Sequence, residues 1–114
     1  MMTEHFIKNI DFSKALTMET LVQYTEGQVV SRTLTQGKSL SITLFAFAEG
    51  EEISAHSSSG DALVYLLDGE AEITIGEEKF SLKKGETIVM PAGVPHALLA
   101  VKKFKMILTV VFTQ

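Results

Sequence analysis

In this chain of 114 residues, the side chains best suited to chemistry are those of two histidines, His56 and His96. An imidazole can bind a transition metal, exchange a proton near neutral pH or hydrogen-bond to a ligand. Both histidines lie in strand-like segments, where side chains two residues apart share a face. This alternation places Ser54, His56 and Ser58 on one face, and it predicts that both imidazoles point inward. His5, the third histidine, has no partner at ligand spacing.

Asp61 is the carboxylate nearest to His56, and it follows residues 57–60, a serine- and glycine-rich run that looks like a loop. If this loop turns Asp61 inward, the three side chains would form a two-histidine, one-carboxylate set of the kind used by non-haem iron. The alternative is that Asp61 caps a turn, a common role for Asp. Two imidazoles alone bind metal weakly, so they would then serve as hydrogen-bonded cavity residues.

The segments that position these residues are predicted to be short β-strands. Period-two alternation dominates from about residue 29 onward. The predicted strands cover residues 40–46, 62–67, 70–75, 79–82, 87–90 and 104–112, with turns at 68–69, 76–77, 84–85 and 91–93. The last strand places Phe104, Met106, Leu108, Val110 and Phe112 on one side. Many short strands separated by turns are typical of an antiparallel sandwich or barrel.

The N-terminal third contains the only helical signal. Ser13 is a candidate N-cap for a short helical turn that includes Leu16, Met18 and Leu21. We expect residues 1–28 to form an extension that packs on the barrel, and residues 29–114 to form the barrel itself. The chain length fits a single domain.

Composition excludes several classes of function. The net charge is −4 and the Lys and Arg residues are dispersed, which argues against nucleic-acid binding. Cysteine is absent, so any metal would need imidazole or oxygen ligands. The N-terminus has no apolar core typical of a signal peptide, and the longest apolar runs are too short to cross a membrane. We therefore expect a soluble, cytoplasmic protein that contacts no membrane.

The spacing of glycine, proline and histidine resembles the cupin superfamily of small jelly-roll barrels. The second cupin motif has Gly, Pro, Gly and His at fixed spacing, and Gly85, Pro91, Gly93 and His96 match it. In the first motif, Gly50, His56 and Gly69 fall in place. The resemblance covers about half of the chain and implies an all-β jelly-roll barrel, also called a double-stranded β-helix.

The cupin metal site is degenerate in this sequence. In the family, three histidines and one glutamate hold a divalent metal inside the barrel. Here Ser58 replaces the second histidine, and Ala62 or Leu63 stands where the glutamate would be. Ala100 replaces the asparagine of the second motif. Of the four metal ligands, the resemblance therefore implies that only His56 and His96 remain.

Two functions follow from the resemblance. The first is a binding module that holds a small apolar or carboxylated molecule, with His56 and His96 as polar anchors. The other expected cavity residues are Ser58, Val64, Leu66, Met90, Leu98 and Met106. The second is a metal-dependent enzyme of the isomerase, cyclase or dioxygenase type, with Fe, Mn, Ni, Cu or Zn held by His56, His96 and Asp61.

The strands also predict self-association. Phe45 and Phe47 oppose Leu44 and Ala46 on the same strand, so both of its faces are apolar. The outer face must be covered by a partner or by the N-terminal segment. We expect a two-fold homodimer.

Overall fold

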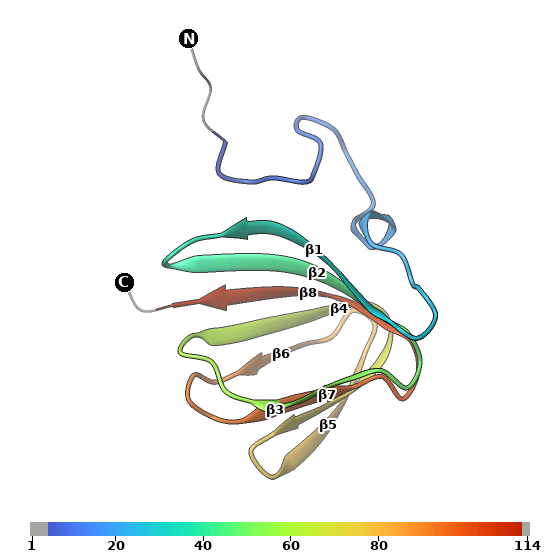
Figure 1. Ribbon diagram of the computed structural model, residues 1–114, viewed down its shortest axis with the longest axis vertical. Helices are drawn as coiled ribbons and strands as arrows, with labels where there is room; N and C mark the ends of the chain where they lie inside the picture. Colours follow the sequence, from blue (N-terminus) through green and yellow to red (C-terminus); the bar gives the residue numbers. More distant parts are fainter. Residues whose placement is uncertain (1–4, 113–114) are drawn as a thin grey trace.

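A curled antiparallel β-sheet forms the body of the protein (Figure 1), as the sequence predicts. The computed structural model describes residues 5–112. Its elements are η1 (Met18–Leu21), β1 (Val29–Gln36), β2 (Leu40–Phe47), β3 (Glu52–His56), β4 (Asp61–Ile75), β5 (Glu78–Lys83), β6 (Thr87–Met90), β7 (His96–Leu99) and β8 (Phe104–Val111). Within residues 5–112, no helix has the length and apolar character needed to span a bilayer.

The strands form two layers that share the long strand β4. The first half of β4 pairs with β8 and β6, and β8 continues through β2 to β1. The second half of β4 pairs with β5 and β7, and β7 pairs with β3. The layers curl toward each other around an apolar interior (Figure 1). This arrangement brings β3 and β7, which carry the two histidines, beside one another.

The turn predicted at Asp68-Gly69 is wrong, because β4 runs through this point as one bent strand. Its register against β8 shifts between Leu66 and Asp68. Gly69 has a φ of 78°, and a Cβ there would overlap the carbonyl oxygen of Lys103. Glycine is therefore required for a close backbone approach where the strand passes between layers, not for a chain reversal. The turns predicted at 76–77, 84–85 and 91–93 are confirmed.

The inner faces of both layers form the main core. Phe47 and Phe104 are fully buried and stack with a distance of 4.4 Å between ring centroids. The side of β8 predicted to face inward does so: Phe104, Met106 and Val110 are buried, and Leu108 and Phe112 pack against them. Burial of these side chains supplies the main driving force for closing the barrel.

The N-terminal segment covers part of the outer face of β1, β2 and β8. Val22 is buried against Leu34, Leu44 and Ala46 in a second apolar cluster. Partly buried side chains from the segment complete the cluster: Ile10, Met18, Leu21 and Tyr24. Leu44 and Ala46, which oppose Phe45 and Phe47 on β2, are thus covered within the same chain.

The N-terminal helix is only a 3-10 turn, η1, and the predicted N-cap is wrong. Thr17 precedes the turn and makes no capping hydrogen bond through its side chain. Ser13 lies four residues away in the left-handed region, with a φ of 59°. The apolar residues of this segment pack across a sheet face, and this tertiary packing overrides a weak helical preference.

Tyr24 fastens the segment to the barrel. Its hydroxyl donates to Asp68 Oδ2 at 2.6 Å. The Nζ atoms of Lys103 and Lys105 lie 4.7 and 4.9 Å from its ring centroid. Lys105 Nζ also donates to the carbonyl oxygen of Glu19 at 2.7 Å. Burial, followed by the hydrogen bond to Asp68, raises the pKa of the Tyr24 phenol.

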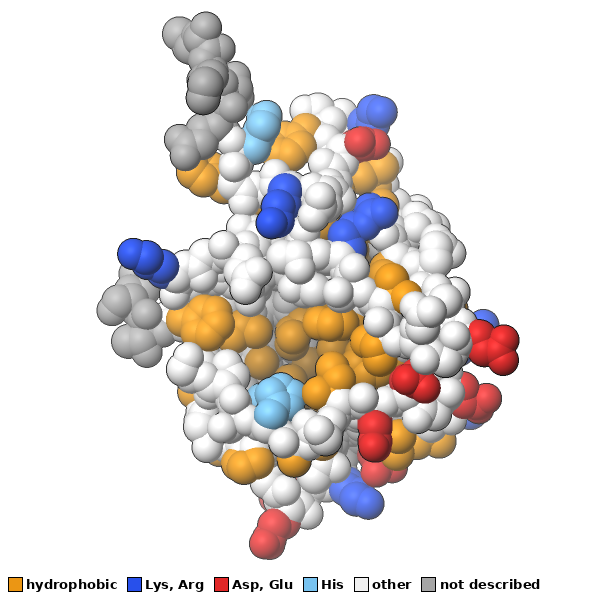
Figure 2. Space-filling model, in the orientation of Figure 1, with side chains coloured by type: hydrophobic (Ala, Val, Ile, Leu, Met, Phe, Trp, Pro, Cys, Tyr) orange, Lys and Arg blue, Asp and Glu red, His pale blue; other side chains and the backbone are white. Residues whose placement is uncertain are grey.

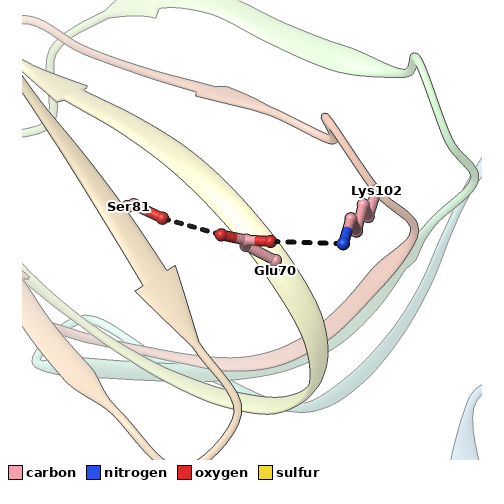
Figure 3. Close-up of polar contacts among 3 residues, drawn as sticks. All are labelled: Glu70, Ser81 and Lys102. Atoms are coloured by element: carbon pink, nitrogen blue, oxygen red, sulfur yellow. Dashed lines mark hydrogen bonds and ion pairs between the residues drawn. The ribbon is translucent and has the colours of Figure 1, made fainter.

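The outer face of the second layer, over β4 and β5, is charged. Ser81 Oγ donates to Glu70 Oε1 at 3.0 Å, and Lys102 Nζ lies 3.8 Å from Glu70 Oε2 (Figure 3). Lys79 Nζ lies 3.6 Å from Glu72 Oε1. Exposed pairs of this kind contribute little to stability individually. They keep this face solvated.

Candidate functional site

A cavity of about 310 Å³ opens into the barrel between the two layers. Its wall is mostly apolar and receives side chains from both layers, including Phe45, Ile53, Ala62, Leu108 and Val110. Figure 2 shows this hollow, with hydrophobic side chains inside it and an imidazole at its edge. His56 and His96 both line it, together with the hydroxyl-bearing Ser57 and Ser58. Among the described residues that line the cavity, none is Asp, Glu, Lys or Arg.

The structure separates the expected cavity residues into two groups. Ser58, Met90, Leu98 and Met106 line the cavity. Val64 and Leu66 are fully buried in the main core and do not line it. Alternation along β4 assigns these two side chains to the inner face, but it carries no information about their depth in the barrel.

The two histidines are direct neighbours. They are register partners between β3 and β7, and their ring centroids are 4.4 Å apart with an interplanar angle of 67°. His96 is only 4% exposed, whereas His56 is exposed to solvent. Two histidines 40 residues apart in sequence therefore form one imidazole pair at the cavity wall.

Backbone carbonyls set the tautomers of both rings. His56 Nδ1 lies 3.0 Å from the carbonyl oxygen of Ser54, and His96 Nδ1 lies 3.3 Å from that of Val94. A carbonyl oxygen only accepts, so each Nδ1 carries the hydrogen and donates it. In the neutral rings, each Nε2 therefore keeps a free lone pair. The pair presents two hydrogen-bond acceptors.

Burial keeps His96 neutral at physiological pH. Desolvation lowers the pKa of His96 from its usual 6.5, and the nearby imidazole of His56 lowers it further. The hydrogen bond to the carbonyl of Val94 acts in the opposite direction and is the smallest of these effects. The buried side of the cavity therefore carries an uncharged imidazole at neutral pH.

A β-bulge changes which residues of β3 face the cavity. The register between β3 and β7 shifts between Ile53 and His56, and both of these side chains line the cavity. Ser54, which alternation places on the face of His56, is not among the lining residues. The inserted residue breaks the period of two, so the prediction for Ser54 is wrong.

Asp61 joins two loops at this end of the barrel. Its Oδ1 accepts a hydrogen bond from the backbone N–H of Ala92 at 2.8 Å. Beside it, Gly93 N–H donates to the carbonyl oxygen of Ser58 at 2.9 Å. Asp61 thus holds the loop that leads into His96. The contact differs from the local turn cap considered from the sequence, because it joins Asp61 to a loop 31 residues away.

The residues present do not fit a cupin metal centre. Within residues 5–112, no group of three or more His, Cys, Asp or Glu side chains is placed to hold a metal ion. The structure does not bring Asp61 together with the histidine pair. At the family's glutamate position, Ala62 points a methyl group into the cavity, and Leu63 lies on the outer face, 41% exposed. No reaction step through a metal follows from this donor set.

Two curated relatives share part of the sequence, and both are uncharacterized proteins. One from Streptomyces coelicolor is 30% identical over 59 residues, which is 52% of this chain and 56% of the relative. One from Methanocaldococcus jannaschii is 38% identical over 40 residues, which is 35% of this chain and 32% of the relative. The matches thus span about half and one third of those proteins.

Solved structures match almost the whole chain, and a family model matches more than half of it. A conserved protein of unknown function from Streptococcus pyogenes is 48% identical, with 97% of each chain covered and a TM-score of 0.96. A cupin superfamily protein from Desulfitobacterium hafniense is 34% identical, covering 94% of this chain and 98% of that one, with a TM-score of 0.89. The Cupin_2 model, described as a cupin domain, matches residues 43–112. The chain belongs to this cupin family.

Proposed function

We propose that this cupin binds a small, largely apolar molecule in its barrel cavity, with His56 and His96 as hydrogen-bonding anchors. The observation that carries the proposal is the pair of adjacent imidazoles, with ring centroids 4.4 Å apart, in a mostly apolar wall. A cavity of about 310 Å³ has the size of a small-ligand pocket. Ligand sites commonly combine an apolar wall with a few convergent polar groups.

The substituted motif positions support an organic ligand. Ser58 and Ala62 both line the cavity at the positions where the family has metal ligands. Serine and alanine are smaller than histidine and glutamate, so these replacements leave space as well as removing donors. Ser58 Oγ accepts a hydrogen bond from Gly60 N–H at 3.1 Å, and its own hydrogen remains available to a ligand.

The protonation of His96, whose pKa is lowered by burial, selects the polar group of the ligand. A neutral imidazole with its hydrogen on Nδ1 accepts a hydrogen bond at Nε2, so a hydroxyl or a protonated carboxyl is complementary to it. A carboxylate binds only if an imidazole takes up a proton. Affinity for an alcohol should therefore fall as the pH drops, whereas affinity for a carboxylate should rise.

A matched set of probes tests the proposal. Toluene, benzyl alcohol and benzoate share one aromatic ring and differ in the polar group. We expect benzyl alcohol to raise the melting temperature more than toluene at pH 8, and benzoate to gain effect at pH 6. His56→Ala should abolish the difference between benzyl alcohol and toluene, and His5→Ala should preserve it. Equal stabilisation of wild type and His56→Ala by benzyl alcohol would contradict the proposal.

Metal-dependent catalysis stays a prediction. Its protein ligands would be His56 and His96, without Asp61. The same melting assay with Fe, Mn, Ni, Cu or Zn separates it from organic-ligand binding. A metal that raises the melting temperature of wild type, but not of His56→Ala or His96→Ala, would favour a metal site.

A further inference from the structure

We propose that the ligand of the barrel cavity is a planar aromatic alcohol with two rings, and that Phe45 is the residue that selects the ring. This inference rests on the proposed function and names the chemical class of its ligand. It starts from the first-layer side of the cavity, where Phe45, Met90 and Met106 form part of the wall. These side chains do more than offer apolar area, because aromatic rings and thioethers both favour an aromatic neighbour.

Phe45 ends a row of three aromatic rings. The centroids of Phe45 and Phe47 are 6.1 Å apart with an interplanar angle of 52°, and Phe47 stacks on Phe104. Phe47 and Phe104 are fully buried, whereas Phe45 is only partly buried and lines the cavity. Part of the Phe45 ring is thus left for a ligand. An aromatic ligand would extend the row in the offset-stacked or edge-to-face geometry that aromatic pairs prefer.

Two methionines strengthen the preference for an aromatic ring. Met106 is the register partner of Phe45, and Met90 is the register partner of Ala62. Both methionines are almost completely buried in the wall of the cavity. A thioether makes favourable contacts with aromatic rings, and its flexible chain adapts to the shape of a ligand. Ala62 lies between Met90 and Val110 in the sheet, and its small side chain leaves room for a ring there.

The opposite wall sets the polar group of the ligand. His56 and His96 come from the second layer, so a ring that lies against Phe45 can direct a substituent toward the imidazoles. Among the described residues, the cavity wall includes no Asp, Glu, Lys or Arg that would pair with an ionic group. A neutral imidazole accepts a hydrogen bond from a hydroxyl. The wall therefore favours an aromatic alcohol over an aromatic ion.

The volume of the cavity indicates a ligand with two rings. At about 310 Å³, it is about twice as large as a cavity of about 150 Å³ that binds benzene. A single ring would leave part of the wall without contacts, and the missing contacts would weaken binding. We therefore expect a ligand with a ring system of about the size of naphthalene.

Benzyl alcohol and cyclohexylmethanol separate ring selection from hydrophobicity. They have the same carbon skeleton and the same hydroxyl, but only benzyl alcohol has a planar aromatic ring. Cyclohexylmethanol is the more hydrophobic, so burial of apolar area alone predicts that it binds more tightly. We expect wild type to bind benzyl alcohol about two- to tenfold more tightly in calorimetric titrations at pH 8. Equal or tighter binding of cyclohexylmethanol would overturn the inference.

Substitutions in the wall test which residues select the ring. Phe45→Leu should remove the preference for benzyl alcohol but retain binding, because leucine is apolar and has no ring. Phe45→Tyr keeps the ring and should retain the preference. Met90→Leu nearly conserves volume and removes one thioether, so it should narrow the ratio of the two dissociation constants. Phe80→Leu is the control, since Phe80 is exposed on β5 and does not line the cavity.

Circular dichroism identifies the variants that fold. An unchanged ratio in Phe45→Leu would contradict the role of Phe45. If Phe45→Leu does not fold, an unchanged ratio in Met90→Leu would contradict selection by the first-layer wall. A ratio altered as much by Phe80→Leu as by either variant would also contradict it.

The same titrations distinguish a failure of this inference from a failure of the proposed function. His56→Ala should weaken the binding of both alcohols, because both use the hydroxyl. Equal binding of the two alcohols to wild type, with this dependence on His56, would overturn the aromatic selection and leave the cavity as a ligand site. No binding of either alcohol would overturn both.

The expected size of the ligand is tested with 2-naphthalenemethanol. The chain has no tryptophan, so the fluorescence of the naphthalene ring can be followed during a titration. We expect a lower dissociation constant than for benzyl alcohol, because the second ring fills more of the cavity. An equal or higher dissociation constant would contradict the two-ring class.

Discussion

His56 and His96 are in contact, yet they belong to very different parts of the barrel. His96 begins β7, between β3 and the second half of β4, and it is almost fully buried. His56 ends β3, the last strand in the sheet order, and it is exposed. One imidazole is thus part of the barrel wall, and the other is an accessible partner at its edge. The site therefore combines a hydrogen-bond acceptor held by packing, His96, with one that has more freedom to move, His56.

The largest effect is expected when the buried member is removed. His96→Ala should lower the free energy of unfolding by about 1–3 kcal/mol, because it leaves a void and removes the hydrogen bond to Val94. Urea denaturation measures this change. His5→Ala is the control and should have no effect. A stability equal to wild type would show that His96 is not a structural part of the wall.

A smaller loss is expected from loosening the loop that leads into His96. Asp61→Ala should cost about 0.5–1 kcal/mol, because Ala92 N–H loses its acceptor. Asp61→Asn keeps a side-chain oxygen at this position and should restore most of the stability in the same urea experiment. If Asn were as damaging as Ala, the negative charge of Asp61, and not only its acceptor oxygen, would be required at this position.

The pH dependence of stability reports the difference in burial. Because the pKa of His96 is lowered in the folded protein, the unfolded chain binds more protons below pH 6.5. The free energy of unfolding should therefore fall as the pH drops below 6.5 and level off once His96 is protonated in the fold. Urea denaturation of wild type and His96→Ala between pH 8 and pH 5 measures this component. An identical pH profile in the variant would contradict the assignment.

The smallest change in stability is expected at the exposed member. His56→Ala should alter the free energy of unfolding by no more than about 0.5 kcal/mol, because its ring is exposed on an edge strand. Ligand binding, in contrast, should be lost. A destabilisation as large as that of His96→Ala would show that the two rings do not differ in the proposed way.

The sequence predicts the barrel well because the spacing of glycine and proline depends on the local backbone conformation of the turns. The turns around Gly76, Gly85 and Gly93 are local, and all three have positive φ in the structure. Gly69 has the same type of signal but a different role, since it is required by the backbone of Lys103. That contact comes from a distant part of the chain, so local spacing does not distinguish it from a turn.

The site is predicted less completely, because depth and register depend on packing between strands. The alternation rule places His56 and His96 toward the interior, and both line the cavity. It fails for Ser54, where a bulge intervenes, and it does not separate Val64 from Met90 by depth. The loop contact of Asp61 joins residues 31 positions apart, and the sequence left its role open.

The most direct test is side-chain ¹⁵N NMR of the histidines, because the chain has only three. In the free protein at pH 8, His56 and His96 should show the tautomer with hydrogen on Nδ1. Adding benzyl alcohol should shift the Nε2 resonances of both, and leave His5 unchanged. Shifts confined to His5, or no shift in either His56 or His96 at saturating ligand, would contradict the claim that this imidazole pair anchors a ligand.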